Sequence, residues 1–137
     1  MEKVILLGKV DKKLFQNLSD EVLFFENFSE IKDKNAIFIV NSEDKKALRF
    51  LSKTSSVAVT CGLSSKDTFT FSSKDYETAV VSLMRSVKSV YENMAEPMEI
   101  PISFPQNTDE YTILSLVATL ILTEKISIKN NNKIYRL

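Results

Sequence analysis

Histidine is absent from this 137-residue chain, and cysteine occurs once, at Cys61. The absence of histidine excludes Ser-His-Asp triads and histidine metal sites, because the residue that moves the proton or binds the metal is missing. One cysteine can form neither a disulfide within the chain nor a cysteine-rich zinc site. We therefore expect no metal and no cofactor.

Glycine is almost as scarce, with Gly8 and Gly62 as its two positions. Phosphate-binding loops need glycines for tight turns and for close approach of the backbone to the ligand. Neither the dinucleotide fingerprint G-x-G-x-x-G nor the P-loop pattern G-x-x-x-x-G-K-[ST] can be written anywhere in the chain. The sequence predicts no phosphate-binding loop of either type.

Excess charge and long apolar runs are also missing. Lys plus Arg and Asp plus Glu number 18 each, so we expect no nucleic-acid partner. The apolar run at the N-terminus is too short for the core of a signal peptide. The longest apolar stretch, 113–122, falls well short of the roughly 20 residues of a membrane helix. We expect a cytoplasmic protein with no membrane segment.

What is present is a globular composition, with 44% hydrophobic and 26% charged residues, and we interpret residues 1–137 as one domain. Short apolar runs are typical of buried strands and alternate with short helical segments. These runs are 4–7, 22–25, 37–40 and 57–60. The pattern predicts an α/β fold, a Rossmann-like and mostly parallel sheet with helices on both faces.

The second half of the chain has a different pattern. Residues 68–71 alternate polar and apolar, as in a half-exposed strand. Residues 78–91 fit a helix or a strand, and we favour a strand, a turn near 92–94 and a second strand over 98–104, together a small antiparallel subsheet. Pro97 and Pro101 place that last strand at a sheet edge or put the prolines at its ends.

Two helices complete the prediction. Ser42 is the expected N-cap of the first, with Glu43 and Asp44 in its first turn. The second opens at residues 107–109 and continues to about 124. It is apolar on most sides, which indicates burial against the sheet or against a partner chain. The polar tail, 129–137, frays or adds an edge strand.

The candidate ligand-binding residues follow the third and fourth predicted strands, where open α/β sheets bind ligands. Helix capping explains the first group without any ligand and is the favoured interpretation. Cys61 could act as a nucleophile with Lys66, but no histidine exists to activate it. The candidates are Asn41, Glu43 and Asp44 after one strand, and Gly62, Lys66 and Asp67 after the next.

The run Ile39-Val40-Asn41-Ser42-Glu43-Asp44, followed by a helix, a strand ending at Gly62, and Asp67, resembles the second half of the Mur ligase central domain. Pro105-Gln106-Asn107 stands where that family has a Gly-x-His-Asn turn before a buried helix. The resemblance implies that Asn107 matches an adenine-contacting position. Because the phosphate loop is missing and Gln106 replaces the histidine, it implies a shared fold without ligation.

These patterns lead to a functional hypothesis with two alternatives. The favoured hypothesis is a non-catalytic binding or scaffolding protein with a protein partner or a second copy, self-associating through the apolar surface around the last helix. The first alternative is a sensor of a small ligand, a nucleotide or a cell-wall precursor. An enzyme using Cys61 and Lys66 is the least favoured, and no catalytic residue is assigned.

Overall fold

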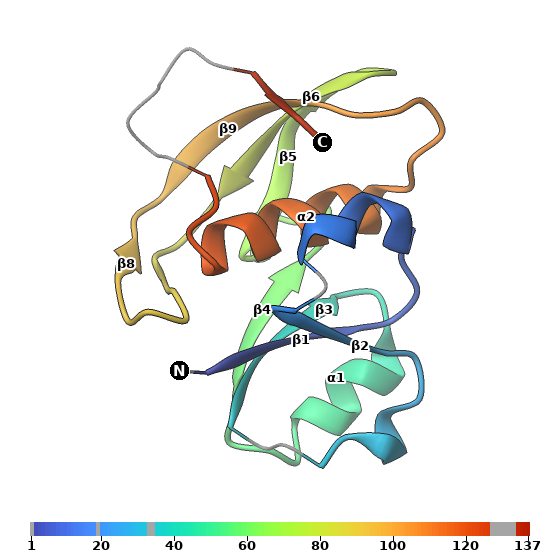
Figure 1. The fold of residues 1–137 in the computed structure, drawn as a ribbon, viewed down its shortest axis with the longest axis vertical. Coiled ribbons are helices and arrows are strands. Elements are labelled where there is room, and N and C mark those ends of the chain that lie inside the picture. The colour runs from blue at the N-terminus through green and yellow to red at the C-terminus, as the bar shows by residue number, and fades with distance from the viewer. Residues whose placement is uncertain (1, 19, 33–34, 127–133) are drawn as a thin grey trace.

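The computed structural model describes residues 2–18, 20–32, 35–126 and 134–137. Within these residues, eight strands form one sheet in the order β10-β9-β6-β5-β4-β3-β1-β2 (Figure 1). Strands in the first half pair in parallel, which confirms the predicted α/β fold with a mostly parallel sheet. They are β1 (Lys3–Leu7), β2 (Val22–Phe25), β3 (Ala36–Asn41) and β4 (Val57–Cys61).

Helical segments cover both faces of this parallel half. The chain moves from β3 to β4 through α1 (Lys45–Leu51) and from β1 to β2 through the 3-10 helix η1 (Lys12–Leu18). These connections run in opposite directions across the sheet, so right-handed crossovers place them on opposite faces. Ile5 and Leu7 pack on the face of α1, whereas Val4 and Leu6 pack with η1 on the other. A sheet buried on both faces needs strands that are apolar throughout, and this is the pattern of the sequence.

The start of α1 differs from the prediction. Its N-cap is Asp44, whose side chain accepts a hydrogen bond from the Ala47 N–H at 3.1 Å. Asn41 forms a turn first, because its side-chain oxygen accepts from the Glu43 N–H and its carbonyl accepts from the Asp44 N–H. The helix therefore begins later than Ser42 would require. A second short 3-10 helix, η2 (Phe28–Glu30), precedes β3.

The strand interpretation of the second half is confirmed, but the stretch 78–91 holds a strand over 78–83 and a separate two-residue strand at 87–88 and not one continuous strand. β5 (Phe69–Lys74), β6 (Thr78–Leu83) and β9 (Met98–Ser103) pair antiparallel. β7 (Val87–Lys88) and β8 (Met94–Ala95) form a separate two-stranded sheet around the predicted turn, where Glu92 has a positive φ of 67°.

At the outer edge of this half, the structure corrects the predicted edge position of strand 98–104 and adds a strand from the tail. β9 is not the last strand, because β10 (Tyr135–Arg136) pairs with it in parallel. Pro101 lies inside β9, just before Ile102 and Ser103, the two residues with which β10 pairs. Residues 134–137 thus supply the predicted edge strand, while 129–133 lie outside the described residues.

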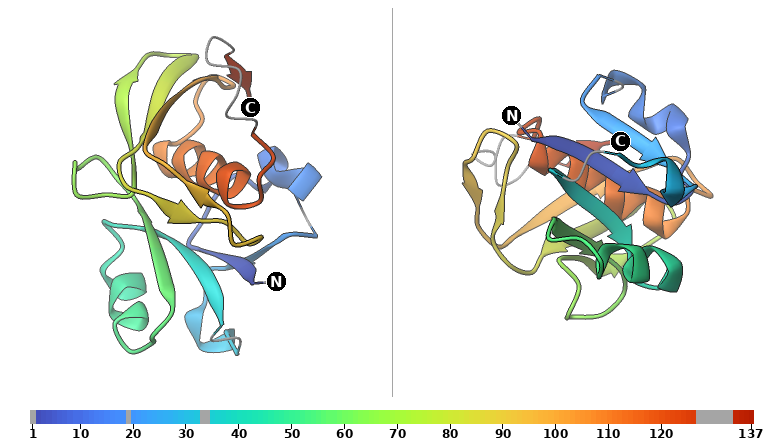
Figure 2. Two further views of the ribbon diagram at one scale, coloured as in Figure 1. Left: turned by 90° about the vertical axis from the view of Figure 1, so that its left-hand side faces the viewer. Right: turned by 90° about the horizontal axis from the view of Figure 1, so that it is seen from below.

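The long helix, α2 (Glu110–Leu122), is buried within its own chain. Asp109 is its N-cap and accepts from the Thr112 N–H at 3.0 Å. Figure 2 shows α2 enclosed between the curved antiparallel strands and η1. Burial of α2 against the sheet is confirmed. Because its own chain covers the apolar surface of α2, that surface is not available for the predicted self-association. No helix among the described residues is long and apolar enough to cross a membrane.

The two halves of the sheet meet at the end of β4. β4 and β5 pair in parallel at Cys61 and Phe69 alone. Next to this pair, side chains replace the backbone ladder, because the Thr60 and Thr68 hydroxyls each accept from the other residue's N–H, at 3.0 and 3.2 Å. The carboxyl ends of β3 and β4 lie at this junction, beside the first turn of α2.

Candidate functional site

A crevice lies between β1 and β3 at the carboxyl edge of the sheet. The chain leaves β1 toward β2 on one side and leaves β3 toward β4 on the other. Such a topological switch point is where open α/β sheets usually bind ligands, beyond the carboxyl ends of the strands. Pairing between β1 and β3 ends at Leu6 and Ile39, so the strands separate from that point.

Tyr111, in the first turn of α2, fills this crevice. Its hydroxyl donates to the Leu7 carbonyl oxygen at 2.5 Å and lies 3.3 Å from that of Ile39. A Cβ placed on Gly8, which has a φ of 107°, would lie 3.4 Å from the edge of the Tyr111 ring. The usual ligand position of this fold is thus occupied by the protein's own side chain.

A small hollow of about 240 Å³ remains beside Tyr111. Ligand pockets usually measure about 300–1,000 Å³, so this one suits at most a small molecule. It brings together three of the predicted residues, Asn41, Glu43 and Gly62. Its other lining residues are Cys61, Leu63, Asp109, Glu110, Tyr111 and Leu114.

The polar residues after β3 serve the backbone. As described above, Asn41 closes a turn and Asp44 caps α1. The favoured capping interpretation therefore accounts for these two side chains, although the N-cap is Asp44 and not Ser42. Glu43 is left at the rim of the hollow.

Gly62 is required by the close approach of two side chains. A Cβ at this position would lie 2.2 Å from Ser42 Oγ and 2.3 Å from Asp67 Oδ2. Asp67 is only 4% exposed, and its Oδ2 accepts from the Ser64 N–H at 3.1 Å. Asp67 and Gly62 therefore form one tight turn in which the carboxylate packs against the glycine.

Lys66 and Asn107 are not part of this hollow. The Lys66 backbone N–H donates to Ser64 Oγ, its carbonyl accepts from the Arg85 guanidinium, and the residue is exposed. Asn107 has a φ of 67° and lines a different, open hollow of about 570 Å³. Asn41 and Asn107, the two asparagines that match the Mur ligase pattern in kind, therefore line two different hollows.

Cys61 is buried at the floor of the hollow. Burial raises the pKa of its thiol well above the usual range, and the negative charge of Asp67 raises it further. A thiolate is the nucleophilic form of cysteine, so the neutral thiol is inert at physiological pH. This arrangement argues against the catalytic alternative based on Cys61 and Lys66.

The charge of the hollow is negative. Glu43, Asp109 and Glu110 line it, and none of its lining residues is Lys or Arg. Asp109 uses both carboxylate oxygens on Thr112, accepting from its N–H and from its hydroxyl. The carboxylates that line the hollow make it unsuited to phosphates.

Within the described residues, no group of three or more His, Cys, Asp or Glu could hold a metal ion.

The sequence interpretation did not select Tyr111 or Asp109 as site residues. Their signal was present, because a tyrosine directly after a capping aspartate begins a helix that is otherwise almost wholly apolar. A buried tyrosine hydroxyl needs a hydrogen-bond partner, and strand ends supply free carbonyl groups. Which strand end would supply them could not be derived without the tertiary structure.

A second candidate feature is the free edge of the sheet at β2. Among the residues that the structure describes, β2 is the last strand of the sheet and pairs with β1 alone. The Gly8 N–H donates to the Phe25 carbonyl at 2.9 Å, so the backbone groups of Phe25 point toward β1. Because these groups alternate in direction along a strand, those of Val22 and Phe24 point away from the sheet. No hydrogen bond from the described part of the chain reaches them.

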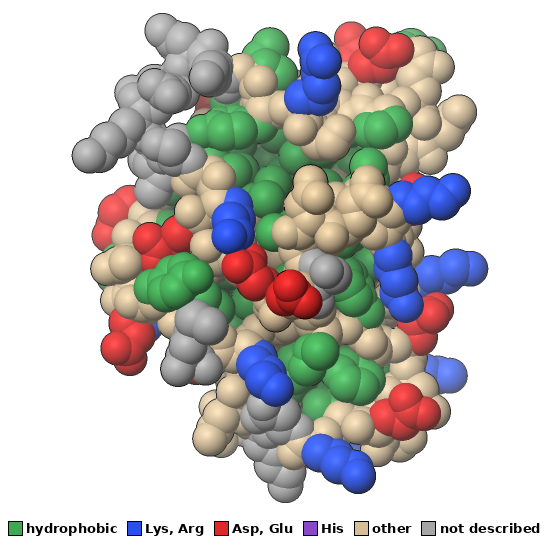
Figure 3. Space-filling view, in the orientation of Figure 1, with side chains coloured by type: hydrophobic (Ala, Val, Ile, Leu, Met, Phe, Trp, Pro, Cys, Tyr) green, Lys and Arg blue, Asp and Glu red, His purple; other side chains and the backbone are tan. Residues whose placement is uncertain are grey.

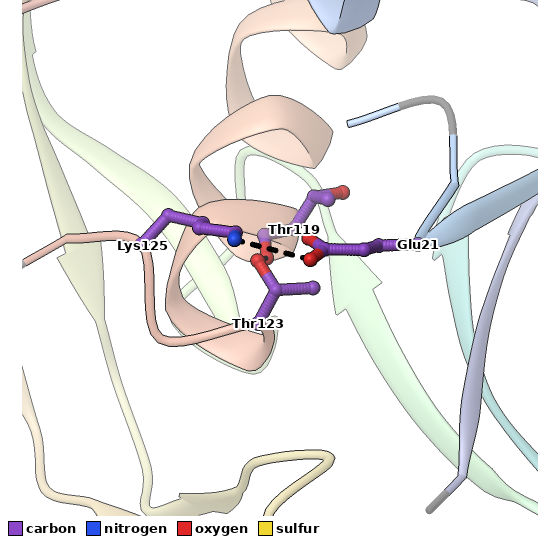
Figure 4. A network of polar contacts seen from close by, with 4 residues as sticks. All are labelled: Glu21, Thr119, Thr123 and Lys125. Atoms are coloured by element: carbon purple, nitrogen blue, oxygen red, sulfur yellow. Dashed lines mark hydrogen bonds and ion pairs between the residues drawn. The ribbon is translucent and has the colours of Figure 1, made fainter. Parts of the chain in front are cut away.

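An ion pair connects the residue directly before β2 with the segment that follows α2 (Figure 4). Lys125 Nζ lies 3.0 Å from Glu21 Oε1, and this hydrogen bond, followed by the charge of Glu21, raises the pKa of Lys125. Thr119 and Thr123 stand beside the pair, but their hydroxyls donate to α2 carbonyls. Glu21 Oε2 is buried with no hydrogen-bond partner among the described residues.

Comparison with known proteins finds no matching family model, no matching curated protein and no matching solved structure. The resemblance to the Mur ligase central domain therefore stays a prediction. Two features of the described residues bear on function, the acidic hollow and the sheet edge at β2.

Proposed function

We propose that this protein is a non-catalytic binding domain that accepts an extended segment of a protein partner beside β2. The observation that carries the proposal is the direction of the Val22 and Phe24 backbone groups, which point away from β1 and which a new strand would satisfy. The Val22 side chain itself is buried in the core. Addition of a strand to an exposed sheet edge is a common mode of peptide recognition, in which main-chain hydrogen bonds provide affinity.

The composition of β2 supports this role. Leu23 is 40% exposed and Phe24 and Phe25 are half-buried, so the edge offers apolar contacts as well as hydrogen bonds. Figure 3 shows exposed hydrophobic side chains on the lower half of the molecule, where Figure 1 draws β2. Proteins usually protect edge strands by keeping them very short or by adding lysine, proline or a bulge. β2 is short, with four residues, but it contains no lysine, no proline and no bulge.

Amide hydrogen exchange and a displayed library of random peptides test the proposal together. In the free protein, we expect protected Leu23 and Phe25 amides and fast exchange at Val22 and Phe24. Peptides that the library enriches should then slow exchange at Val22 and Phe24. They should also lose affinity for Leu23→Asn but keep it for Leu48→Asn, a matched control because Leu48 is 37% exposed on α1.

Two results would refute this function. One is a library from which no peptide is enriched. The other is an enriched peptide that binds both variants equally and leaves exchange at Val22 and Phe24 unchanged, because it would then bind elsewhere on the surface.

The alternative function is a small-ligand sensor, and the observation that favours it is the hollow beside Tyr111. The volume and the carboxylates of that hollow favour a small neutral or cationic ligand over a nucleotide or a phosphorylated cell-wall precursor. A ligand that binds only the folded protein raises its melting temperature by mass action, so a thermal-shift screen detects a sensor. A cytoplasmic location fits either function and is part of the proposal.

A further inference from the structure

We propose that the segment accepted by β2 has an apolar centre with basic residues at its ends, and that it belongs to another protein and not to a second copy of this chain. This inference rests on the proposed function and names the chemistry of its partner. It is carried by the charges that flank β2 and by what two-fold symmetry would do with them.

Acidic residues surround β2 on both sides in the sequence. Segment 20–30 contains four carboxylates and no Lys or Arg, although the whole chain has equal numbers of both charges. Asp20 and Glu21 precede the strand, Glu26 follows it, and Glu30 lies in η2. Opposite charges across neighbouring strands stabilise pairing, so lysine or arginine at the ends of an incoming segment would be favoured.

Most of these carboxylates have no ion-pair partner. Glu21 is paired with Lys125, as described above. Among the described residues, Asp20, Glu26 and Glu30 form no ion pair, and all three are exposed. Their charges therefore remain available to a partner at both ends of the strand.

One basic group stands on a face of β2. Lys12 Nζ, on η1, lies 5.6 Å from the centre of the Phe24 ring. Phe24 also makes an edge-to-face contact with Phe15 of η1, with ring centroids 5.2 Å apart. This face of the strand is therefore covered by the protein itself. A new strand has to approach in the plane of the sheet, with its basic residues toward the strand ends.

A second copy fits this edge poorly. Two β2 strands related by a two-fold axis would pair antiparallel, which brings the Glu21 end of each strand to the Glu26 end of the other. Carboxylates would then face carboxylates at both ends, and like charges across strands destabilise pairing. At about 3.3 Å per residue, β2 is also only about 13 Å long, which is little contact for a dimer of folded domains.

Three displayed libraries with the same random apolar core test the inference. Their flanking residues are fixed as lysine, glutamine or glutamate, so only the charge at the ends differs. We expect peptides from the lysine library to bind about fivefold more tightly than the same cores flanked by glutamine, the effect of two exposed ion pairs. This preference should weaken at high salt and disappear in the Asp20→Asn, Glu26→Gln double variant. Leu48→Asn should retain it.

Each other outcome has a definite meaning. Equal binding of lysine-flanked and glutamine-flanked cores overturns the basic partner while leaving strand addition at β2 intact. Failure of all three libraries refutes the proposed function itself. A dimer detected by sedimentation, and dissociated by Leu23→Asn but not by Leu48→Asn, identifies a second copy as the occupant and overturns the inference.

Discussion

The hydroxyl of Tyr111 donates a hydrogen bond to the backbone carbonyl of Leu7, at 2.5 Å, across the crevice where this type of sheet usually binds ligands. Leu7 is the last residue of β1, and the pairing of β1 with β3 has already ended at Leu6 and Ile39. The side chain of α2 thus satisfies a carbonyl group that the sheet leaves free. It also closes the crevice.

Replacing Tyr111 should show how much this hydrogen bond contributes to the free energy of unfolding. We expect Tyr111→Phe to lower the free energy of unfolding by about 1–2 kcal/mol, because the Leu7 carbonyl loses its partner in a partly buried place. Urea unfolding followed by circular dichroism measures the change. Tyr76→Phe is the control, since Tyr76 is 84% exposed and its hydroxyl should contribute nothing measurable. Equal stability of the two variants would contradict the role given to Tyr111.

Stability should decrease at alkaline pH. Burial comes first among the causes that raise the pKa values of Cys61 and Tyr111, and negative charges nearby add to it. In the unfolded chain these groups lose their protons near pH 8.5 and 10, whereas in the folded protein they retain them. Their contribution is therefore complete below about pH 8.5 and decreases as pH rises, by up to about 1.4 kcal/mol per pH unit for each group.

The measurement is the free energy of unfolding from pH 7 to 11. Wild type should lose stability more steeply than Tyr111→Phe above about pH 10, and more steeply than Cys61→Ala from about pH 8.5. Tyr76→Phe should follow the wild-type curve. Parallel curves for wild type and Tyr111→Phe would show that the Tyr111 hydroxyl titrates alike in both states.

Gly62 should tolerate no side chain. Because a Cβ would lie 2.2 Å from Ser42 Oγ and 2.3 Å from Asp67 Oδ2, Gly62→Ala must displace the turn that carries Asp67. We expect a loss of at least about 1–3 kcal/mol, as in other overpacked sites. Ser65→Ala, at an exposed position of the same turn, should change stability by less than about 0.5 kcal/mol. A Gly62→Ala protein as stable as Ser65→Ala would contradict this packing.

Cys61 should resist alkylation while the protein is folded. Its thiol is buried and neutral, so iodoacetamide should modify it slowly at neutral pH and rapidly in denaturing urea. The matched control places a thiol at the surface, as Ser65→Cys in a Cys61→Ala background, and should react at once. Rapid native modification of Cys61 would revive the catalytic alternative.

Nucleotides should not stabilise the protein. The hollow beside Tyr111 is small and lined by carboxylates, so it should repel a triphosphate. We expect no change in melting temperature with ATP, with or without Mg²⁺, in a thermal-shift assay. A saturable increase would instead favour the nucleotide-sensor alternative, and with it the resemblance to the Mur ligase central domain.

The sequence alone determined the fold class and most of the strands. Strands at 4–7, 22–25, 37–40 and 57–60 could be predicted because a parallel sheet covered on both faces needs apolar residues at every position. The burial of α2 followed from its apolar composition for the same reason. The absence of histidine and the scarcity of glycine were equally direct, since histidine-dependent sites and glycine-rich phosphate loops cannot form without these residues.

Only the tertiary structure decided which residues meet. Asn41, Glu43 and Gly62 line one hollow while Asn107 lines another, and Glu110 at the start of α2 lines both. The contact of Tyr111 with Leu7 joins residues 104 positions apart, and no local pattern encodes such a pair. The same holds for the free edge. VLFF predicts a strand, but that β2 is the last strand depends on the order in which all eight strands pair.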